Sequence, residues 1–227
     1  MQVHPVERAI GYRFRDRDLL RGSTNTWHRL FGPLEHLGDA IADLVVGLNC
    51  NRIGLGPDVA SRIVDNAHLE AVLTRRLRRV VRPRTGDVIE ALIGGVHLDS
   101  DFDHAARVTV NLLMPDVQWR PIAETSPAGL MAGSNELVWL GALVLDAVIA
   151  DDLIRRRGPG RTSQRELSRH RSEIVSTKNL EQMIRRRAVL SGSVLDARDL
   201  KGSIAATMLA NGWGPTRRLV LDLLGAE

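Results

Sequence analysis

The chain has 227 residues, which is enough for one large domain or for two of about 110 residues each. Aromatic residues make up 4% of it and hydrophobic residues 44%, so we expect an aliphatic core, which favours helices over a β-sandwich. The single cysteine excludes an internal disulfide, and the absence of a signal segment or of an apolar run of roughly 18 residues predicts a cytoplasmic protein that does not span a membrane.

The net charge is +4, and arginine carries almost all of the positive charge, since Lys178 and Lys201 are the only lysines. Arginine is suited to bidentate contacts with phosphate. A coding preference for arginine explains the composition equally well. A modest positive charge therefore permits nucleic-acid binding without demonstrating it.

The N-terminal segment is predicted to be helical, with short connections. A first helix covers Val6 to Ile10 and ends at Gly11. Either Asp16 or Asp18 is expected to cap the next helix. Residues 23–33 are expected to be a short irregular segment.

Residues 34–49 are predicted to form an apolar helix with an acidic edge. Its apolar residues recur at intervals of three and four and form one buried stripe, which consists of Leu34, Leu37, Ile41, Leu44, Val45 and Leu48. Glu35 and Asp39 are four residues apart, so their side chains lie on the same face of the helix.

After a break at Gly54 to Pro57, a helix is predicted from about Val59 to Val80, with Asp58 as its candidate N-cap. Its end and the following loop are strongly basic, and the candidate phosphate contacts there are Arg75, Arg76, Arg79, Arg82 and Arg84. Such a run is usually a solvated helix face.

Residues 86–99 are predicted to form a second apolar helix that carries carboxylates, and residues 101–113 an amphipathic one. Asp87 and Glu90 are three residues apart and share a face, while Ile89, Ile93 and Val96 line the opposite side. If the two acidic helices packed face to face, four carboxylates would meet.

Four facing carboxylates repel one another and raise one another's pKa values, so a bound cation is the usual reason to retain them. Oxygen ligands suit Mg²⁺ or Mn²⁺, and such a site can polarise a phosphoryl oxygen and activate water. The predicted chemistry is phosphodiester hydrolysis. The alternative is that each acidic pair is only the solvated edge of an amphipathic helix.

Three motifs in order resemble the ribonuclease III family. These are VERAIGYRFRDRDLL at the N-terminus, LEHLGDAIADLVV in the first acidic helix and GDVIEALIGGVHLD in the second. The resemblance implies an all-α endonuclease domain that cuts double-stranded RNA with Mg²⁺. It implies that Glu35, Asp39, Asp87 and Glu90 are the catalytic and metal-binding residues, and it makes phosphate contacts by the basic run plausible.

The second half of the chain repeats these patterns after a proline-containing linker. We expect a ribonuclease III-like domain at residues 1–114, a linker at 115–128 and a second, degenerate domain at 129–227. The segment SNELVWLGALVLDAVIA echoes the first acidic helix, ELSRHRSEIVSTKNL resembles another family segment, and RDLKGSIAATMLANGW echoes the second acidic helix.

The repeat lacks the acidic residues. On this alignment the four carboxylates correspond, in chain order, to Val138, Ala142, Arg198 and Lys201. None of these side chains binds Mg²⁺, and two are cations that would repel it. We therefore expect a single active centre per chain.

The family pairs two such domains, which implies an intramolecular pseudo-dimer here. Because both domains belong to one chain, their pairing would not depend on protein concentration. His36 and Trp139 occupy the family's pairing position in the two halves, although His36 could simply be packed and Trp139 could be an ordinary core residue. A homodimer through the first repeat is the other assembly. We expect RNA specificity to come from the nuclease surface or from a partner protein.

The main hypothesis is a Mg²⁺-dependent endoribonuclease, with Mn²⁺ as a substitute, that nicks double-stranded or structured RNA. The alternative is a non-catalytic RNA-binding or scaffold component of a ribonucleoprotein. The intact acidic quartet favours the enzyme, and the degenerate second half favours the scaffold.

Overall fold

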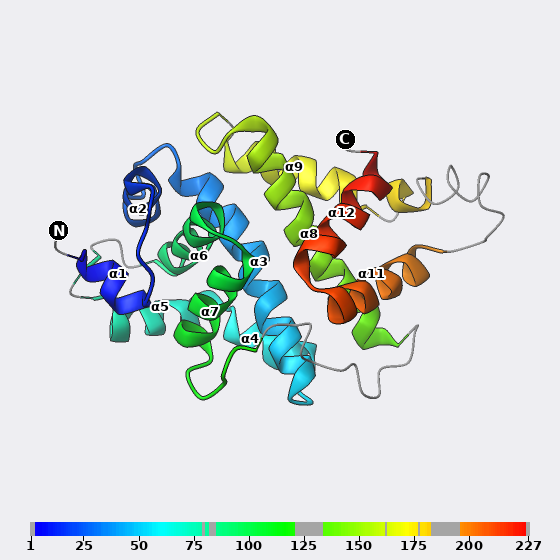
Figure 1. The fold of residues 1–227 in the computed structure, drawn as a ribbon, viewed down its shortest axis with the longest axis horizontal. Coiled ribbons are helices and arrows are strands. Elements are labelled where there is room, and N and C mark those ends of the chain that lie inside the picture. Colours follow the sequence, from blue (N-terminus) through cyan, green and yellow to red (C-terminus); the bar gives the residue numbers. More distant parts are fainter. Residues whose placement is uncertain are drawn as a thin grey trace. The chain divides into compact units, whose positions relative to one another are not determined.

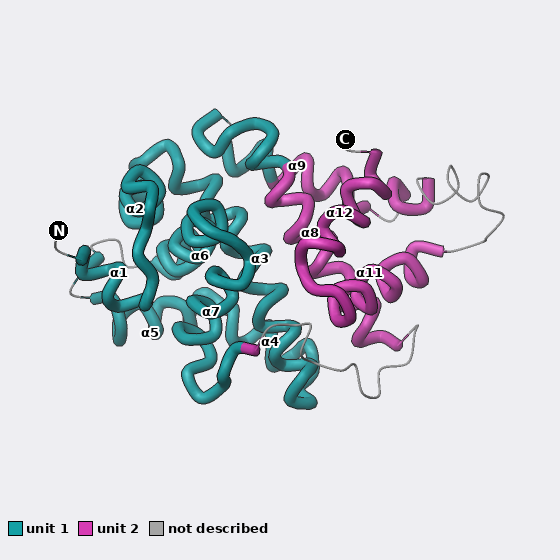
Figure 2. Tube along the Cα trace, in the orientation of Figure 1, with its two compact units in different colours: residues 1–119, 153–167 teal, residues 120–152, 168–227 magenta. Residues whose placement is uncertain are grey.

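The computed structural model describes residues 3–78, 80–81, 85–120, 134–161, 163–176, 178–182 and 196–225. Every regular element in these ranges is a helix, so the predicted all-α class is confirmed (Figure 1). None of the described helices is long and apolar enough to cross a membrane. The chain forms two compact units, of which unit 1 is Met1–Trp119 with Leu153–Leu167 and unit 2 is Arg120–Asp152 with Ser168–Glu227 (Figure 2).

The described helices of unit 1 are α1 (Pro5–Ile10), α2 (Arg17–Thr24), α3 (Phe31–Arg52), α4 (Pro57–Ile63), α5 (Asn66–Arg76), α6 (Asp87–Asp99) and α7 (Phe102–Leu113). The chain continues with α8 (Asn135–Arg157), α9 (Gln164–Val175), α11 (Ala197–Asn211) and α12 (Trp213–Leu224). The end of α8 and the beginning of α9 belong to unit 1, and the rest of both helices belongs to unit 2.

Helix α6 is the centre of unit 1. Each of its residues from Val88 to His97 is buried, and the helix packs against α2, α3, α5 and α7. A helix that is apolar on nearly all sides is expected to lie inside a domain, where other helices cover every face. Asp87 and Glu90 lie in its first turn, where the positive end of the helix dipole favours carboxylates.

The backbones of α3 and α6 approach each other closely where the two helices cross. A Cβ atom on Gly38 would lie 1.7 Å from the carbonyl oxygen of Glu90, and one on Gly94 would lie 2.1 Å from that of Leu34. Any side chain at either position would force the helices apart. The two glycines therefore allow the acidic turns of α3 and α6 to lie next to each other.

The loop between α1 and α2 is fixed to the end of α6 by one carboxylate. Asp99 accepts hydrogen bonds of 2.7 Å from the Tyr12 hydroxyl and from the backbone N–H groups of Arg15 and Asp16. Asp16 in turn caps α2 by accepting a hydrogen bond from the N–H of Asp18. Of the two candidate caps, Asp16 is therefore the N-cap.

The prediction of one continuous helix over residues 59–80 is wrong, because the structure has two helices there. Helix α4 ends at Ile63, and α5 begins at Asn66. Asp65 adopts an extended backbone, and its side chain accepts a hydrogen bond of 2.8 Å from the N–H of Ala67, so it caps α5. The apolar period continues across this break without a glycine or proline, which is why the pattern did not indicate it.

Two smaller predictions in unit 1 are also wrong. Asp58 is not an N-cap, because Gly56 occupies that position and Asp58 lies in the first turn of α4. The irregular segment is shorter than residues 23–33, since α2 runs to Thr24 and α3 begins at Phe31. The Thr24 hydroxyl donates to the Leu20 carbonyl, which satisfies both groups within the last turn of α2.

Unit 2 contains a helix crossing of the same kind as the one between α3 and α6. A Cβ atom on Gly141 of α8 would lie 1.9 Å from the carbonyl oxygen of Lys201 in α11. Helix α12 is attached to α8 by an ion pair in which the Arg217 Nε lies 2.6 Å from Oδ2 of the fully buried Asp151. Gly212 has a φ of 74°, a left-handed conformation that allows the tight turn between α11 and α12.

Candidate metal centre

Three carboxylates meet where α3 crosses α6. Glu35 of α3 and Asp87 and Glu90 of α6 each place a carboxylate oxygen within 4.8 Å of the other two. Asp39 lies one turn further along α3, outside this group of three. The structure thus brings three of the four predicted ligands together, and we call these three the acidic cluster.

Glu90 is the most buried member of the acidic cluster, with a relative exposure of 8%. Burial raises its pKa to about 8, and the negative charges of Asp39, Glu35, Asp87 and Asp43 act in the same direction. Although Asp39 is outside the group of three, its charge is therefore felt at the centre of the cluster.

Glu35 and Asp87 are partly exposed, so the acidic cluster opens to solvent on their side. Burial and the negative charges of Asp87 and Asp39 together raise the pKa of Glu35 to about 7, although a hydrogen bond from Gln164 acts in the opposite direction. Glu35 and Glu90 therefore bind protons more readily near neutral pH than ordinary glutamates do. A cation would remove that repulsion and release the protons.

A residue that the sequence did not indicate also contacts the acidic cluster. The Nε2 atom of Gln164, the first residue of α9, donates a hydrogen bond of 2.6 Å to Oε1 of Glu35. Gln164 lies 129 residues from Glu35 in the chain but belongs to the same unit. The sequence signal near it is a Ser163-to-Glu166 capping box, which fixes where α9 begins but not what its first residue faces.

The donor set of the acidic cluster fits a hard divalent cation. All three side chains offer oxygen, the oxygens are close enough for one ion to bridge them, and one side of the cluster is accessible. Mg²⁺ and Mn²⁺ prefer such oxygen ligands, and Mg²⁺ is commonly held by one or two carboxylates with water in its other positions.

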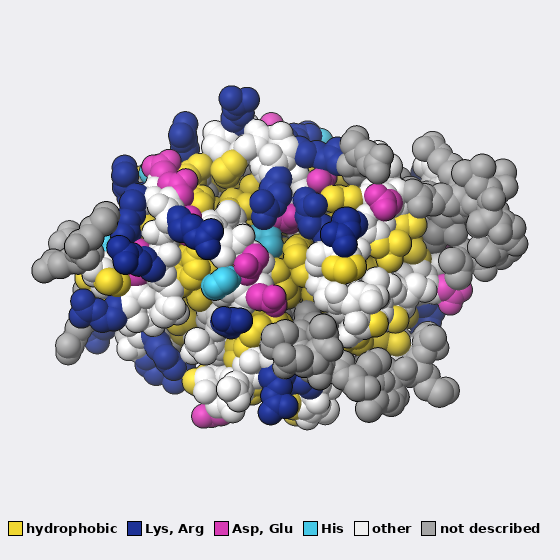
Figure 3. All heavy atoms as spheres, in the orientation of Figure 1, with side chains coloured by type: hydrophobic (Ala, Val, Ile, Leu, Met, Phe, Trp, Pro, Cys, Tyr) yellow, Lys and Arg dark blue, Asp and Glu magenta, His cyan; other side chains and the backbone are white. Residues whose placement is uncertain are grey.

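The other predicted contact residues are less clearly placed. Arg75 and Arg76 are exposed in the last turn of α5, while Arg79, Arg82 and Arg84 lie outside the described residues. On the face of the molecule drawn in Figure 3, arginine side chains surround acidic and histidine side chains in the region of unit 1. The basic run thus remains a predicted RNA contact.

The two predicted pairing residues differ in exposure. His36 is buried, with a relative exposure of 4%, and Trp139 is partly exposed on α8. Their role in domain pairing stays a prediction.

The crossing in unit 2 carries no acidic cluster among the described residues. At the positions aligned with the first-half carboxylates, Val138 and Ala142 lie on α8, and Arg198 and Lys201 lie on α11. The guanidinium of Arg198 donates a hydrogen bond of 2.7 Å to Oδ1 of Asn135. A cation would meet two positive side chains here rather than carboxylates.

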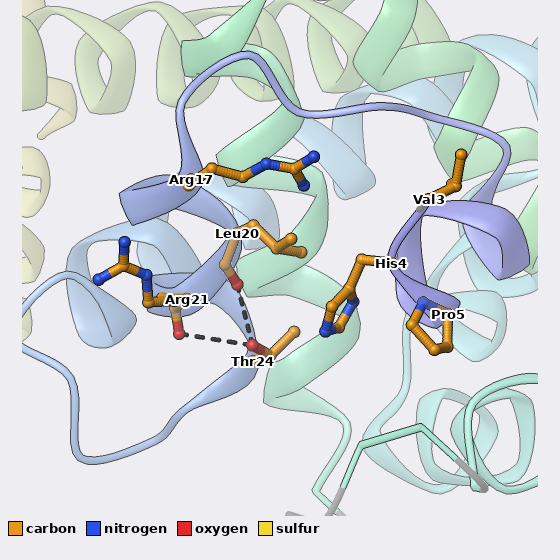
Figure 4. A pocket seen from close by; sticks show the side chains of 7 residues that line it. All are labelled: Val3, His4, Pro5, Arg17, Leu20, Arg21 and Thr24. Atoms are coloured by element: carbon orange, nitrogen blue, oxygen red, sulfur yellow. Dashed lines mark hydrogen bonds between the residues drawn. The ribbon is translucent and has the colours of Figure 1, made fainter. Parts of the chain in front are cut away.

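A separate hollow lies between α1 and α2 (Figure 4). Arg17 and Arg21 line it from α2, and His4 and Pro5 line it from the other side. Arg17 is paired there with the buried Glu7 at 2.7 Å. None of the four predicted metal ligands lines this hollow, so it is not part of the metal centre.

No model of a known protein family matches the chain, and no curated protein sequence matches it.

Proposed function

We propose that the chain is a divalent-metal-dependent endoribonuclease of the ribonuclease III type, with one active centre in its N-terminal half. The observation that carries the proposal is the acidic cluster, in which three carboxylates from two separate helices lie within 4.8 Å of one another. Glycines at the crossing allow those helices to approach each other this closely. A fold that needed only solvated helix edges would not bury Glu90 among like charges.

In this proposal Glu35, Asp87 and Glu90 hold the cation, and Asp39 adds negative charge beside them and completes the predicted quartet. The ion would supply Lewis acidity to a phosphoryl oxygen and to the attacking water. Glu90 forms the buried wall of the centre, while the partly exposed Glu35 and Asp87 face the side from which RNA would approach.

The second repeat supports the proposal of one active centre per chain. The aligned crossing in unit 2 has the same close glycine contact, at Gly141, but Arg198 and Lys201 replace carboxylates. The segment Leu153–Leu167, which belongs to the second repeat in sequence, groups with unit 1. The second half is thus proposed to support the first half structurally rather than to cut RNA itself.

The test is cleavage of an end-labelled RNA duplex by the full chain in Mg²⁺ or in chelator. Wild type should cut in Mg²⁺ only, and Glu90→Ala should lose activity by roughly a hundredfold or more, because even groups that only support a metal ligand are typically worth about 10- to 100-fold. Products should carry 5′-phosphate and 3′-hydroxyl ends. Equal inactivity of wild type and Glu90→Ala on several duplexes would overturn the proposal.

A scaffold role is the second candidate, and the observation in its favour is the loss of all four acids from the repeat. It predicts RNA binding that is unaffected by Glu90→Ala and by chelator. A filter-binding measurement in chelator, made beside the cleavage assay, separates the two roles.

A further inference from the structure

Gln164 is held beside the acidic cluster by its own helix terminus. The Ser163 N–H donates a hydrogen bond of 2.9 Å to Oε2 of Glu166, and the Glu166 N–H donates one of 3.3 Å to the Ser163 hydroxyl. This reciprocal capping box fixes the first turn of α9. Since Gln164 lies between the two capping residues, its backbone has little freedom to move away from Glu35.

The surface of α3 leaves room for Gln164. A Cβ atom on Gly32 would lie only 3.3 Å from the Cβ of Gln164, so a larger residue at position 32 would displace the glutamine. Nearby, a Cβ on Gly160 would lie 3.3 Å from Nε of Arg29, which shows that the chain before α9 also packs closely on unit 1. The chain around the start of α9 thus packs closely on the segment that contains Arg29 and Gly32.

The chemistry of the contact is directional. An ionised carboxylate only accepts hydrogen bonds, so the amide nitrogen of Gln164 faces Glu35. Glu35 is a long, partly exposed side chain that is repelled by Asp87 and Asp39 and would otherwise turn towards solvent. One neutral N–H donor opposes that rotation without adding a charge that would compete with a cation.

We propose that Gln164 is a positioning residue for the metal centre, which holds Oε1 of Glu35 and thereby keeps this carboxylate oriented towards Asp87 and Glu90. The inference rests on the proposed metal-dependent function. Gln164 is assigned no contact with the ion or with RNA. A segment of the second repeat thus contributes to the centre of the first.

The experiment measures Mn²⁺ binding to the full chain by calorimetry at pH 8. Gln164→Leu removes the donor at nearly constant size, and Gln118→Leu is the matched control, because the Gln118 side chain is exposed in the same unit. We expect Gln164→Leu to bind Mn²⁺ about tenfold more weakly, as loss of a hydrogen bond to a metal ligand usually does. Gln118→Leu should bind like wild type.

A second variant protects the test against misfolding. Gly32→Val keeps Gln164 but displaces it, so it should weaken Mn²⁺ binding in the same direction, and the two losses should not add in the double variant. Helical circular dichroism and the thermal midpoint report folding. In RNA cleavage, Gln164→Leu should lower kcat and leave KM for the duplex unchanged, since Gln164 does not bind RNA.

The outcomes distinguish this inference from the proposed function. Wild-type Mn²⁺ affinity in folded Gln164→Leu, with binding abolished in Glu90→Gln, would overturn the role of Gln164 and leave the metal centre intact. Absence of Mn²⁺ binding by wild type, or binding unaffected by Glu90→Gln, would overturn both.

Discussion

Glu90 is buried beside other carboxylates, and this position makes the stability of the metal-free protein depend on pH. Its pKa is about 8 in the folded chain, against an ordinary value of 4.5, because burial and neighbouring negative charges disfavour its ionised form. Glu35 shifts in the same direction, to about 7. The folded state therefore binds protons that the unfolded state has released.

In chelator, the free energy of unfolding should fall as the pH rises from about 5 to about 8. For a carboxyl whose folded pKa is raised, the stabilisation is complete below pH 4.5 and is lost as the pH rises through the folded pKa. Urea unfolding at three pH values in this window should show a loss on the order of 3 kcal/mol.

Two comparisons accompany that measurement. Saturating Mn²⁺ at pH 8 should restore stability, since bound ligand stabilises the folded state. Glu90→Gln should flatten the pH dependence, because it removes the group with the largest shift. A Glu90→Gln protein with the pH dependence of wild type would assign the effect to other groups.

Spacing predicted much of the site at the residue level. The four-residue interval between Glu35 and Asp39 and the three-residue interval between Asp87 and Glu90 indicated which side chains share a helix face. Three of these four carboxylates do lie together. Gln164 could not be predicted in the same way. Its contact depends on where a distant segment returns to the unit, and no local period contains that information.

At the scale of elements, the crossing of α3 and α6 is the feature that assembles the site. Gly38→Ala should destabilise the protein by about 3 kcal/mol or more, because the added methyl group would lie 1.7 Å from a backbone oxygen and would separate the helices. Urea unfolding measures the loss, and Mn²⁺ affinity should fall with it as the carboxylates move apart.

The matched substitution is Gly214→Ala in the first turn of α12. Its added methyl group would meet nothing closer than 4.0 Å, the distance to the Arg218 guanidinium, so the change should be neutral or slightly stabilising. Equal effects of the two substitutions would mean that the α3 and α6 backbones are not tightly apposed.

Helix α12 is expected to depend on its ion pair with α8. Arg217→Leu removes the guanidinium that lies 2.6 Å from the buried Asp151 and should cost about 3 kcal/mol of unfolding free energy. Arg218→Leu, at the exposed neighbouring residue, should change stability by less than about 0.5 kcal/mol. Thermal and urea unfolding of both variants provide the comparison, and equal losses would contradict a specific role for the pair.

Helix positions could be predicted better than helix ends. The apolar periods located α3, α6 and α7, because each buries a stripe or more of its surface. The break at Asp65 could not be read from those periods, since an aspartate cap can interrupt a helix without glycine or proline. Caps depend on one side-chain hydrogen bond, which hydrophobic spacing does not report.

At the scale of the whole molecule, the proposed intramolecular pairing predicts a monomer. Light scattering of the purified protein should give a mass near 25.1 kDa at micromolar concentration, and Mn²⁺ titration should saturate at one centre per chain. A mass of twice this value would favour pairing of two chains through the first repeat and would place two centres in each particle.

The most direct measurement is single-turnover cleavage of one RNA duplex whose two strands carry different labels. With a single competent centre in each chain, wild type in Mg²⁺ should cut one strand of each duplex and leave the other strand intact. Glu90→Gln should cut neither strand. Simultaneous cuts in both strands by monomeric protein, or cleavage by Glu90→Gln at the wild-type rate, would contradict a single acidic centre at the crossing of α3 and α6.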